Sequence, residues 1–345
     1  MHFKNKGGKN YMFKSYSVNN HRMNIPEDDI FLKGKEIVYF PIENTPDAEH
    51  FDERIHKGTK QPTEIDQLII HCSSETDIER VLKEKNYVGA HYVIHRDGTI
   101  LQCVDESKRA YHAGISSWAE VLGGADNINA HAIGIEVENP TFGSTTEYTP
   151  EQMDSLIRLS KSIIARHHIK PHNVIGHSDV SPDRKADPGV LFPWRKLAEA
   201  GIGIFPKYTV LPSEQMMVSG EDLRKLLKTI GYKTETETKK IEGYTEITEI
   251  KDNLPFAWRS FMRHFMPFGI TDERPTPQQI RERREKAPHK STEEILSDAS
   301  LDFMVAYEKN TNLDSPKQVI RVSSSGFKRL KVVAYAFQQS RLKSR

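Results

Sequence analysis

Short apolar runs at regular intervals constrain the fold of this chain more than any other feature. They occur at residues 68–71, 92–94, 133–138 and 174–177, and a further run at 100–101 follows the pair Asp97-Gly98. Runs of this length with branched side chains predict buried strands, and the Asp-Gly pair predicts a hairpin turn. Between the last two strands lies a segment with helical periodicity. Strands that alternate with helices predict an α/β fold.

The helical segment carries its own start signal. Thr149 is a suitable N-cap residue, Pro150 suits the first helical position, and Gln152 completes a capping box. The apolar side chains that recur at helical spacing predict the buried face of this helix: Met153, Leu156, Ile157 and Ile164.

Length and charge limit the class of protein. The 345 residues predict about two domains. With 49 basic and 48 acidic residues the net charge is +1, so no nucleic-acid partner is expected. The longest apolar run, at residues 332–337, is too short to span a membrane, and no apolar stretch that would indicate a signal peptide follows the basic N-terminus. Cys72 and Cys103 are predicted to be buried thiols.

Beyond residue 205, polar stretches separate segments with helical periodicity. Two such segments span residues 219–230 and 258–265, and the apolar positions Leu301, Met304 and Val305 indicate a third helix. The last 31 residues contain eight basic and no acidic side chains, which a solvated helix or tail explains, with contact to an anionic surface as the alternative. We therefore divide the chain into four parts: an N-terminal extension (1–60), an α/β domain (61–205), a small all-helical domain (206–312) and a basic C-terminal segment (313–345).

Three side chains that can bind zinc follow the predicted strands. His71 closes the first strand, His177 follows the last strand, and Asp187 lies ten residues further on. Two imidazoles and one carboxylate leave a tetrahedral zinc ion with one position for water, as in catalytic sites. Because the chain has 15 histidines, spacing alone does not separate this arrangement from ordinary surface or core histidines.

The segments around these residues resemble the N-acetylmuramoyl-L-alanine amidase family, whose type-2 amidase fold is shared with peptidoglycan recognition proteins. Residues 176–189 (GHSDVSPDRKADPG) resemble the zinc-binding loop of that family. The resemblance extends over about residues 63–200 and implies a mixed, mostly parallel sheet flanked by helices, with zinc in a surface groove. Four further blocks carry it in the same order: 68–71 (LIIH), 90–94 (AHYVI), 109–114 (RAYHAG) and 129–136 (NAHAIGIE).

The resemblance also implies a role for each matching residue. One zinc ion per chain would bind His71, His177 and Asp187. Glu136 would act as the general base and then as the acid for the leaving amine, and Lys185 would stabilise the oxyanion. These residue types suit the chemistry, because a carboxylate can transfer a proton and an ammonium group offsets developing negative charge.

Each of the two catalytic assignments has an ordinary alternative. Glu136 could be a solvent-exposed acid on an edge strand, and Lys185 could form a salt bridge with Asp183 or Asp179. Phage amidase-type lysozymes lack a carboxylate at the position of Glu136 and use cysteine as the third ligand. The presence of Glu136 and Asp187 therefore resembles the bacterial anhydromuramyl-peptide amidase branch.

Several neighbouring residues receive weaker expectations. His112 and Trp118 lie on a segment that borders the substrate groove in the family, so each is expected either to bind substrate or to pack locally. His91 is expected to support the strand by bonding to backbone. Cys72 follows a zinc ligand and should point to the opposite face of its strand as a buried bystander. Ala90 stands where the phage enzymes have tyrosine.

The resemblance implies zinc-dependent hydrolysis of the amide bond between N-acetylmuramic acid, or its 1,6-anhydro form, and the L-alanine of the stem peptide. Peptidoglycan or a muropeptide would be the substrate. The rivals are a non-catalytic peptidoglycan-recognition module, which usually lacks the full ligand set, and a structural-zinc protein, which would need a fourth ligand. The helical domain resembles, more weakly, a peptidoglycan-binding region. We expect the cell envelope rather than the cytoplasm as the location, and the sequence leaves the oligomeric state open.

Overall fold

The structure is a computed structural model in which residues 1–35 and 36–345 form two separate compact units. The described part of the first unit is a hairpin of β1 (His2–Lys4) and β2 (Asn10–Met12). All other described elements belong to the second unit. The described residues are 2–4, 10–12, 38–39, 51–55, 62–78, 89–119, 127–207, 215–242, 245–266, 277–286, 304–306 and 319–344.

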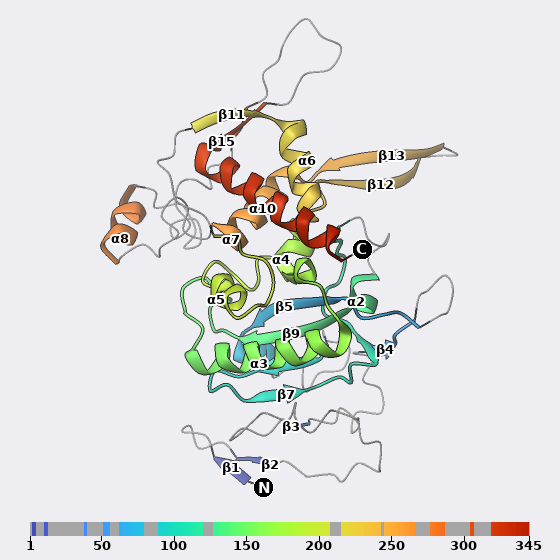
Figure 1. The fold of residues 1–345 in the computed structure, drawn as a ribbon, viewed down its shortest axis with the longest axis vertical. Helices are drawn as coiled ribbons and strands as arrows, with labels where there is room; N and C mark the ends of the chain where they lie inside the picture. The colour runs from blue at the N-terminus through green and yellow to red at the C-terminus, as the bar shows by residue number, and fades with distance from the viewer. Residues whose placement is uncertain are drawn as a thin grey trace, which may run out of the picture. The chain divides into compact units, whose positions relative to one another are not determined.

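The largest sheet of the second unit has six strands in the order β10-β5-β9-β6-β7-β3. Figure 1 labels four of them, β5, β9, β7 and β3. Neighbouring strands are parallel except β6 and β7, which form the hairpin predicted around Asp97-Gly98. The prediction of a mixed, mostly parallel sheet is therefore confirmed. Its strands are β3 (Val38–Tyr39), β5 (Gln67–Ser73), β6 (Tyr92–Ile94), β7 (Ile100–Gln102), β9 (Ala132–Glu138) and β10 (Val174–Gly176).

Helices α3 (Pro150–His167) and α5 (Trp194–Glu199) cover one face of this sheet. The predicted capping box is present, because the Thr149 side chain accepts from the backbone N–H of Gln152 while the Gln152 side chain accepts from that of Thr149. Met153 and Leu156 are fully buried, as expected, and pack in a core with side chains of β5 and β9.

The opposite face of the sheet packs against the part of the chain that follows residue 214, which we call the C-terminal half. Ile69 of β5 and Ile175 of β10 share one apolar core with residues of α6 (Gly220–Ile230), α7 (Leu254–Phe265) and α10 (Ser324–Leu342). A core of this kind holds two segments together through the apolar area that both remove from water. The C-terminal half is thus built onto the sheet.

The prediction that residues 206–312 form an all-helical domain is wrong, because β11, β12, β13 and β14 lie within them. The C-terminal half contains a three-stranded antiparallel sheet and a two-stranded hairpin, and Met304 and Val305, expected in a third helix, lie in a strand. Leu301 lies outside the described residues. Helices α6 and α7 are confirmed, and α8 (Pro277–Lys286) is an additional helix. The strands are β11 (Gln215–Ser219), β12 (Glu235–Glu242), β13 (Thr245–Asp252), β14 (Met304–Ala306) and β15 (Val319–Ser323).

Part of the predicted N-terminal extension joins the fold. Strand β4 (Phe51–Glu53) pairs with β8 (Lys108–Ala110), and β3 forms the end of the large sheet. The remaining elements are the short helices α2 (Asn127–His131) and α4 (His177–Val180) and the 3-10 turn η3 (Pro171–Asn173). Among the helices that the structure describes, none combines the length and apolar composition needed to cross a membrane.

Candidate metal centre and active site

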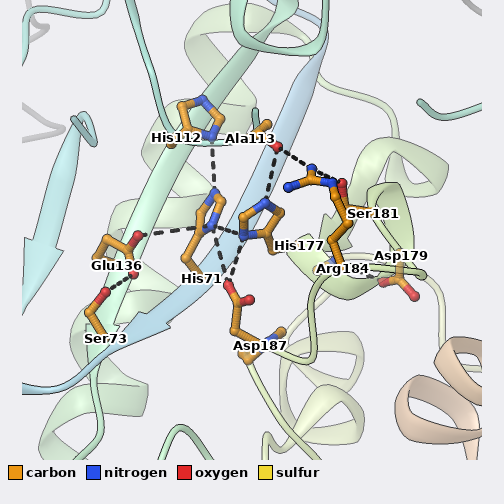
Figure 2. Close-up of polar contacts among 12 residues, drawn as sticks. His71, Ser73, His112, Ala113, Glu136, His177, Asp179, Ser181, Arg184 and Asp187 are labelled. Carbon is orange, nitrogen blue, oxygen red and sulfur yellow. Dashed lines mark hydrogen bonds and ion pairs between the residues drawn. The ribbon is translucent and has the colours of Figure 1, made fainter. Parts of the chain in front are cut away.

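His71, His177 and Asp187 converge at one edge of the sheet (Figure 2). The register pairs Ile70 of β5 with Gly176 of β10, so the next residues along the two parallel strands, His71 and His177, become neighbours. Their Nδ1 atoms lie 2.9 Å apart. The Oδ2 atom of Asp187 lies 3.0 Å from Nδ1 of His177 and 3.4 Å from Nδ1 of His71. Strand pairing therefore produces the predicted group.

The remaining ring nitrogens show that the donor set fits a zinc ion. Nε2 of His177 lies 3.1 Å from the carbonyl oxygen of Ala113, which only accepts, so Nε2 carries the proton and the lone pair of Nδ1 faces Asp187. Nε2 of His71 is similarly held, 3.0 Å from Nδ1 of His112. Two imidazole nitrogens and a carboxylate oxygen therefore face one another, which is the donor set of catalytic zinc sites.

Burial sets the protonation of these groups. Burial, followed by the nearby His177, lowers the pKa of His71 to about 4. Burial alone would raise the pKa of Asp187, but the two imidazoles beside its carboxylate, that of His177 first, hold this pKa below its ordinary value. A neutral imidazole and an ionised carboxylate are the forms that bind a metal cation.

Glu136 stands beside His71 on the neighbouring strand. The parallel register of β5 and β9 pairs the two residues, and Oε1 of Glu136 lies 3.9 Å from Nδ1 of His71. Ser73 donates a hydrogen bond of 2.8 Å to the other carboxylate oxygen. Burial, followed by the charge of Asp187, raises the pKa of Glu136 to about 8. Because β9 is central and Glu136 is only 6% exposed, the alternative of a solvent-exposed edge-strand acid is wrong.

Lys185 lies on the exposed loop between α4 and Asp187. Its charge reaches the cluster, where it acts to lower the pKa of both His71 and Glu136. The alternative salt bridge to Asp179 does not form, because that carboxylate is fully buried and bonds to other side chains. The position therefore suits a cation that acts on the site through space.

His112 lies on the side of His71 away from Asp187 (Figure 2). Its ring is 2% exposed and meets the His71 ring edge-on, with centroids 5.0 Å apart. This packing requires glycine at position 134, since a Cβ there would lie 2.5 Å from the His112 ring. The expectation of substrate contact is corrected, because a buried ring offers no surface to a substrate and instead orients His71.

The expectation that Trp118 contacts substrate is corrected as well, because this side chain is also buried. Its indole is 1% exposed, donates from Nε1 to the carbonyl of His172, and packs edge-on against Tyr232 and Phe337. It also covers Gly231, where a Cβ would lie 2.6 Å from the indole. Trp118 therefore belongs to the core that joins the sheet to the C-terminal half.

Two further expectations are confirmed. Cys72 is 4% exposed and packs with Leu68 and Ile70, whose side chains lie on the face of β5 opposite His71. His91 accepts a hydrogen bond from the backbone N–H of Gly134 and contacts the carbonyl of Lys108. Both residues support the strands and take no direct part in the metal group.

Sequence reasoning missed the roles of two polar residues next to the site, Ser73 and Asp179. Ser73 was detectable, because alternation along a strand places it on the same face as His71. Asp179 lies two residues after His177 but faces away from it, toward partners more than 50 residues distant in the chain. No local pattern identifies such partners.

The fold and site define an α/β protein with a two-histidine, one-carboxylate metal-site geometry. Residues 61–190 match the model of a known family, N-acetylmuramoyl-L-alanine amidase, and this part of the chain belongs to that family. The match contains all three candidate ligands as well as Glu136 and Lys185.

Individual relatives agree with this assignment. The N-acetylmuramoyl-L-alanine amidase AmiD of Escherichia coli K12 is 40% identical over 153 residues, or 40% of this chain and 54% of that protein. The 1,6-anhydro-N-acetylmuramyl-L-alanine amidase AmpD of Enterobacter cloacae is 38% identical over 109 residues, or 32% of this chain and 54% of that protein. The chain thus spans about half the length of these relatives. A solved complex of AmiD from E. coli with anhydro-N-acetylmuramic acid-L-Ala-D-gamma-Glu-L-Lys superposes with a TM-score of 0.47 and 30% identity, over 65% of this chain and 92% of that chain.

Proposed function

We propose that this protein is a zinc-dependent N-acetylmuramoyl-L-alanine amidase that hydrolyses the amide bond between the lactyl group of N-acetylmuramic acid and the L-alanine of the stem peptide. The observation that carries the proposal is the convergence of His71, His177 and Asp187 with the carboxylate of Glu136 beside them. The family match over residues 61–190 supports the choice of reaction.

Each residue of the site would have a separate role in the reaction. The three ligands would hold the zinc ion, which when bound lowers the pKa of a water molecule and polarises a carbonyl group. Glu136 would take a proton from the attacking water and return it to the leaving amine, and the hydrogen bond from Ser73 fixes its carboxylate for that transfer. Lys185 would offset the negative charge that develops on the amide oxygen.

Muropeptides with a 1,6-anhydro sugar are the proposed substrate class. The AmpD relatives are named for this substrate, and the AmiD relative carries the broader name of the reaction. Cell-wall turnover or recycling would supply such a substrate. The location of the protein, in the envelope or the cytoplasm, stays a prediction.

Mass spectrometry of a defined anhydro-disaccharide-tetrapeptide, incubated with the purified full chain, tests the proposal. We expect free tetrapeptide to be released, the release to stop with a chelator, and zinc to restore it. His177→Ala is the matched negative control. The same experiment with the reducing disaccharide-tetrapeptide decides the sugar preference. Binding of muropeptide without release from either substrate would overturn the amidase and favour a recognition module.

A further inference from the structure

The segment that carries the metal ligands is bonded to the C-terminal half of the chain through Asp179. This residue lies on α4, two positions after His177, and its side chain is only 1% exposed. One carboxylate oxygen, Oδ2, accepts from the backbone N–H of Gly176 at 2.8 Å, which is the residue directly before His177. Asp179 therefore fixes the backbone at Gly176, where strand β10 ends and the candidate ligand His177 follows.

Both oxygens of Asp179 also accept from side chains of the C-terminal half. The hydroxyl of Tyr232 donates to Oδ1 at 2.6 Å, and Nδ1 of His264 donates to Oδ2 at 2.7 Å. Ser260 lies 3.3 Å from Oδ1. These three residues come from α7 and from the turn after α6, and all of them are buried. A buried carboxylate is stable only when its oxygens are satisfied in this way.

A second contact reaches the other ligand. Ser260 donates a hydrogen bond of 2.7 Å to the carbonyl of Ser178, and the N–H of Ser178 donates at 2.9 Å to the carbonyl of Asp187. Helix α7 therefore bonds to Ser178, the residue that follows His177 and whose own N–H bonds to the backbone of Asp187. Groups that orient metal ligands from behind commonly change metal affinity by about 10–100-fold when removed.

We propose that the C-terminal half of this chain positions the metal ligands, with Tyr232, Ser260 and His264 as positioning residues that act through Asp179 and Ser178. The inference rests on the proposed zinc site. In this arrangement the C-terminal half is part of the hydrolase rather than an independent wall-binding module. Removing one of its hydrogen bonds should loosen the spacing of His177 and Asp187 without touching either ligand.

The test is the zinc affinity of the purified full chain, measured by competition with a chromogenic chelator, for Tyr232→Phe, Ser260→Ala and His264→Phe. Tyr232→Phe removes one hydroxyl and keeps the ring, so it should fold as the natural chain does. We expect each variant to bind zinc at least tenfold more weakly and His264→Gln, which keeps a donor, to recover part of the loss. The absorption spectrum of the cobalt-loaded protein should change in parallel.

Phe337→Leu is the matched control, because Phe337 lies in the core that joins the C-terminal half to the sheet and is not among the residues bonded to Asp179. It should lower the melting temperature and leave the zinc dissociation constant within twofold. Unchanged zinc affinity in Tyr232→Phe, His264→Phe and Ser260→Ala would overturn the inference while leaving the amidase intact. A natural chain that binds no zinc would overturn the proposed function as well.

Discussion

Nε2 of His71 lies 3.0 Å from Nδ1 of His112, and this contact fixes the ring of a candidate metal ligand on the side away from Asp187. His112 is itself held in place by the ring of His91, edge-on at a centroid separation of 5.6 Å, and by the close approach of Gly134. The three buried histidines thus connect the candidate metal site to the interior of the sheet.

Replacing His112 should therefore weaken metal binding although it is no ligand. We expect His112→Phe, which keeps a planar ring but cannot accept from His71, to raise the zinc dissociation constant about 10–100-fold. Competition with a chelator measures this change. His95→Phe is the control, because the His95 imidazole pairs with Glu138 instead of a ligand. Equal zinc affinity in the natural chain and His112→Phe would show that the contact does not orient His71.

Two variants should distinguish the loss of proton transfer from the loss of metal binding. Glu136→Gln keeps the shape of the side chain and all three ligands, so it should retain zinc but lower kcat about 10²–10⁴-fold, the usual contribution of general acid–base catalysis. His177→Ala removes a ligand and should lose both zinc and turnover. Zinc content by mass spectrometry and tetrapeptide release, measured on the same samples, check this pair. High activity in Glu136→Gln would remove the proton-transfer role.

Lys185 should contribute charge rather than structure. Because its side chain is exposed, we expect Lys185→Ala to leave the melting temperature unchanged and to lower kcat by about 10–100-fold, less than a buried oxyanion donor would. Lys185→Arg should retain more activity than Lys185→Ala. Lys161→Ala, an exposed lysine of α3, serves as the control. A loss confined to KM would indicate substrate binding instead of transition-state stabilisation.

The candidate group of His71, His177 and Asp187 was predicted through the family resemblance, since spacing alone does not single out these histidines, and strand pairing explains why the two histidines meet. A histidine at the end of each of two parallel neighbours must lie at the same sheet edge, and His71 and Glu136 follow from the register of β5 and β9. The N-terminus of α3 was predictable for a similar reason, since Thr149 and Gln152 bond within one turn. In these cases the partners lie close in sequence or on adjacent strands.

The β12–β13 hairpin of the C-terminal half was less predictable because its strands have few apolar residues. The sequence of β12, ETETKKIE, has one apolar residue in eight, and only that isoleucine and the two threonines favour a strand. The basic C-terminal segment does contain a helical signal, Leu330, Val333, Ala334 and Phe337, and these residues are buried in α10. The eight basic residues of this segment led to the prediction of a solvated helix or tail instead of a helix packed in the core. The role of Trp118 depends on Tyr232 and Phe337, which are more than 100 residues away along the chain.

Arg54 should stabilise the fold more than its place near the N-terminus suggests. Its guanidinium is buried, and burial lowers its pKa to about 10. We expect Arg54→Met, which keeps the length of the side chain, to lower the free energy of unfolding by about 3 kcal/mol, because several buried carbonyls lose a donor. The carbonyls that accept from Arg54 belong to Glu106, Lys108, Asn129, Ala130 and Ala132.

Urea unfolding of the full chain measures the effect of Arg54→Met. Arg96→Met is the control, because the Arg96 guanidinium donates to an exposed carbonyl, that of Glu147, and the substitution should cost less than about 0.5 kcal/mol. Equal midpoints for the two variants would contradict the importance of the buried guanidinium.

Glu106 should make stability depend on pH in the acid range. Glu106 is buried, and its carboxylate accepts from Tyr92, Arg166 and His167 at 2.6–2.7 Å. Burial alone would raise its pKa, but the hydrogen bonds from His167 and Arg166 outweigh burial and lower the pKa to about 2, from an ordinary value of 4.5. Because the folded pKa is the lower one, this stabilisation is present above pH 4.5 and is lost as the pH falls toward 2.

Glu106→Gln should remove that dependence. At 1.36 kcal/mol per pKa unit, the natural chain should exceed the variant by about 3 kcal/mol at pH 7, and the two stabilities should converge as the pH approaches 2. Urea unfolding at pH 7, 5, 4 and 3 measures the difference, with Glu75→Gln, an exposed glutamate, as the control that should follow the natural chain throughout. A gap between Glu106→Gln and the natural chain that stays constant from pH 7 to pH 3 would mean that the substitution acts through packing, because only a titrating carboxylate can close the gap.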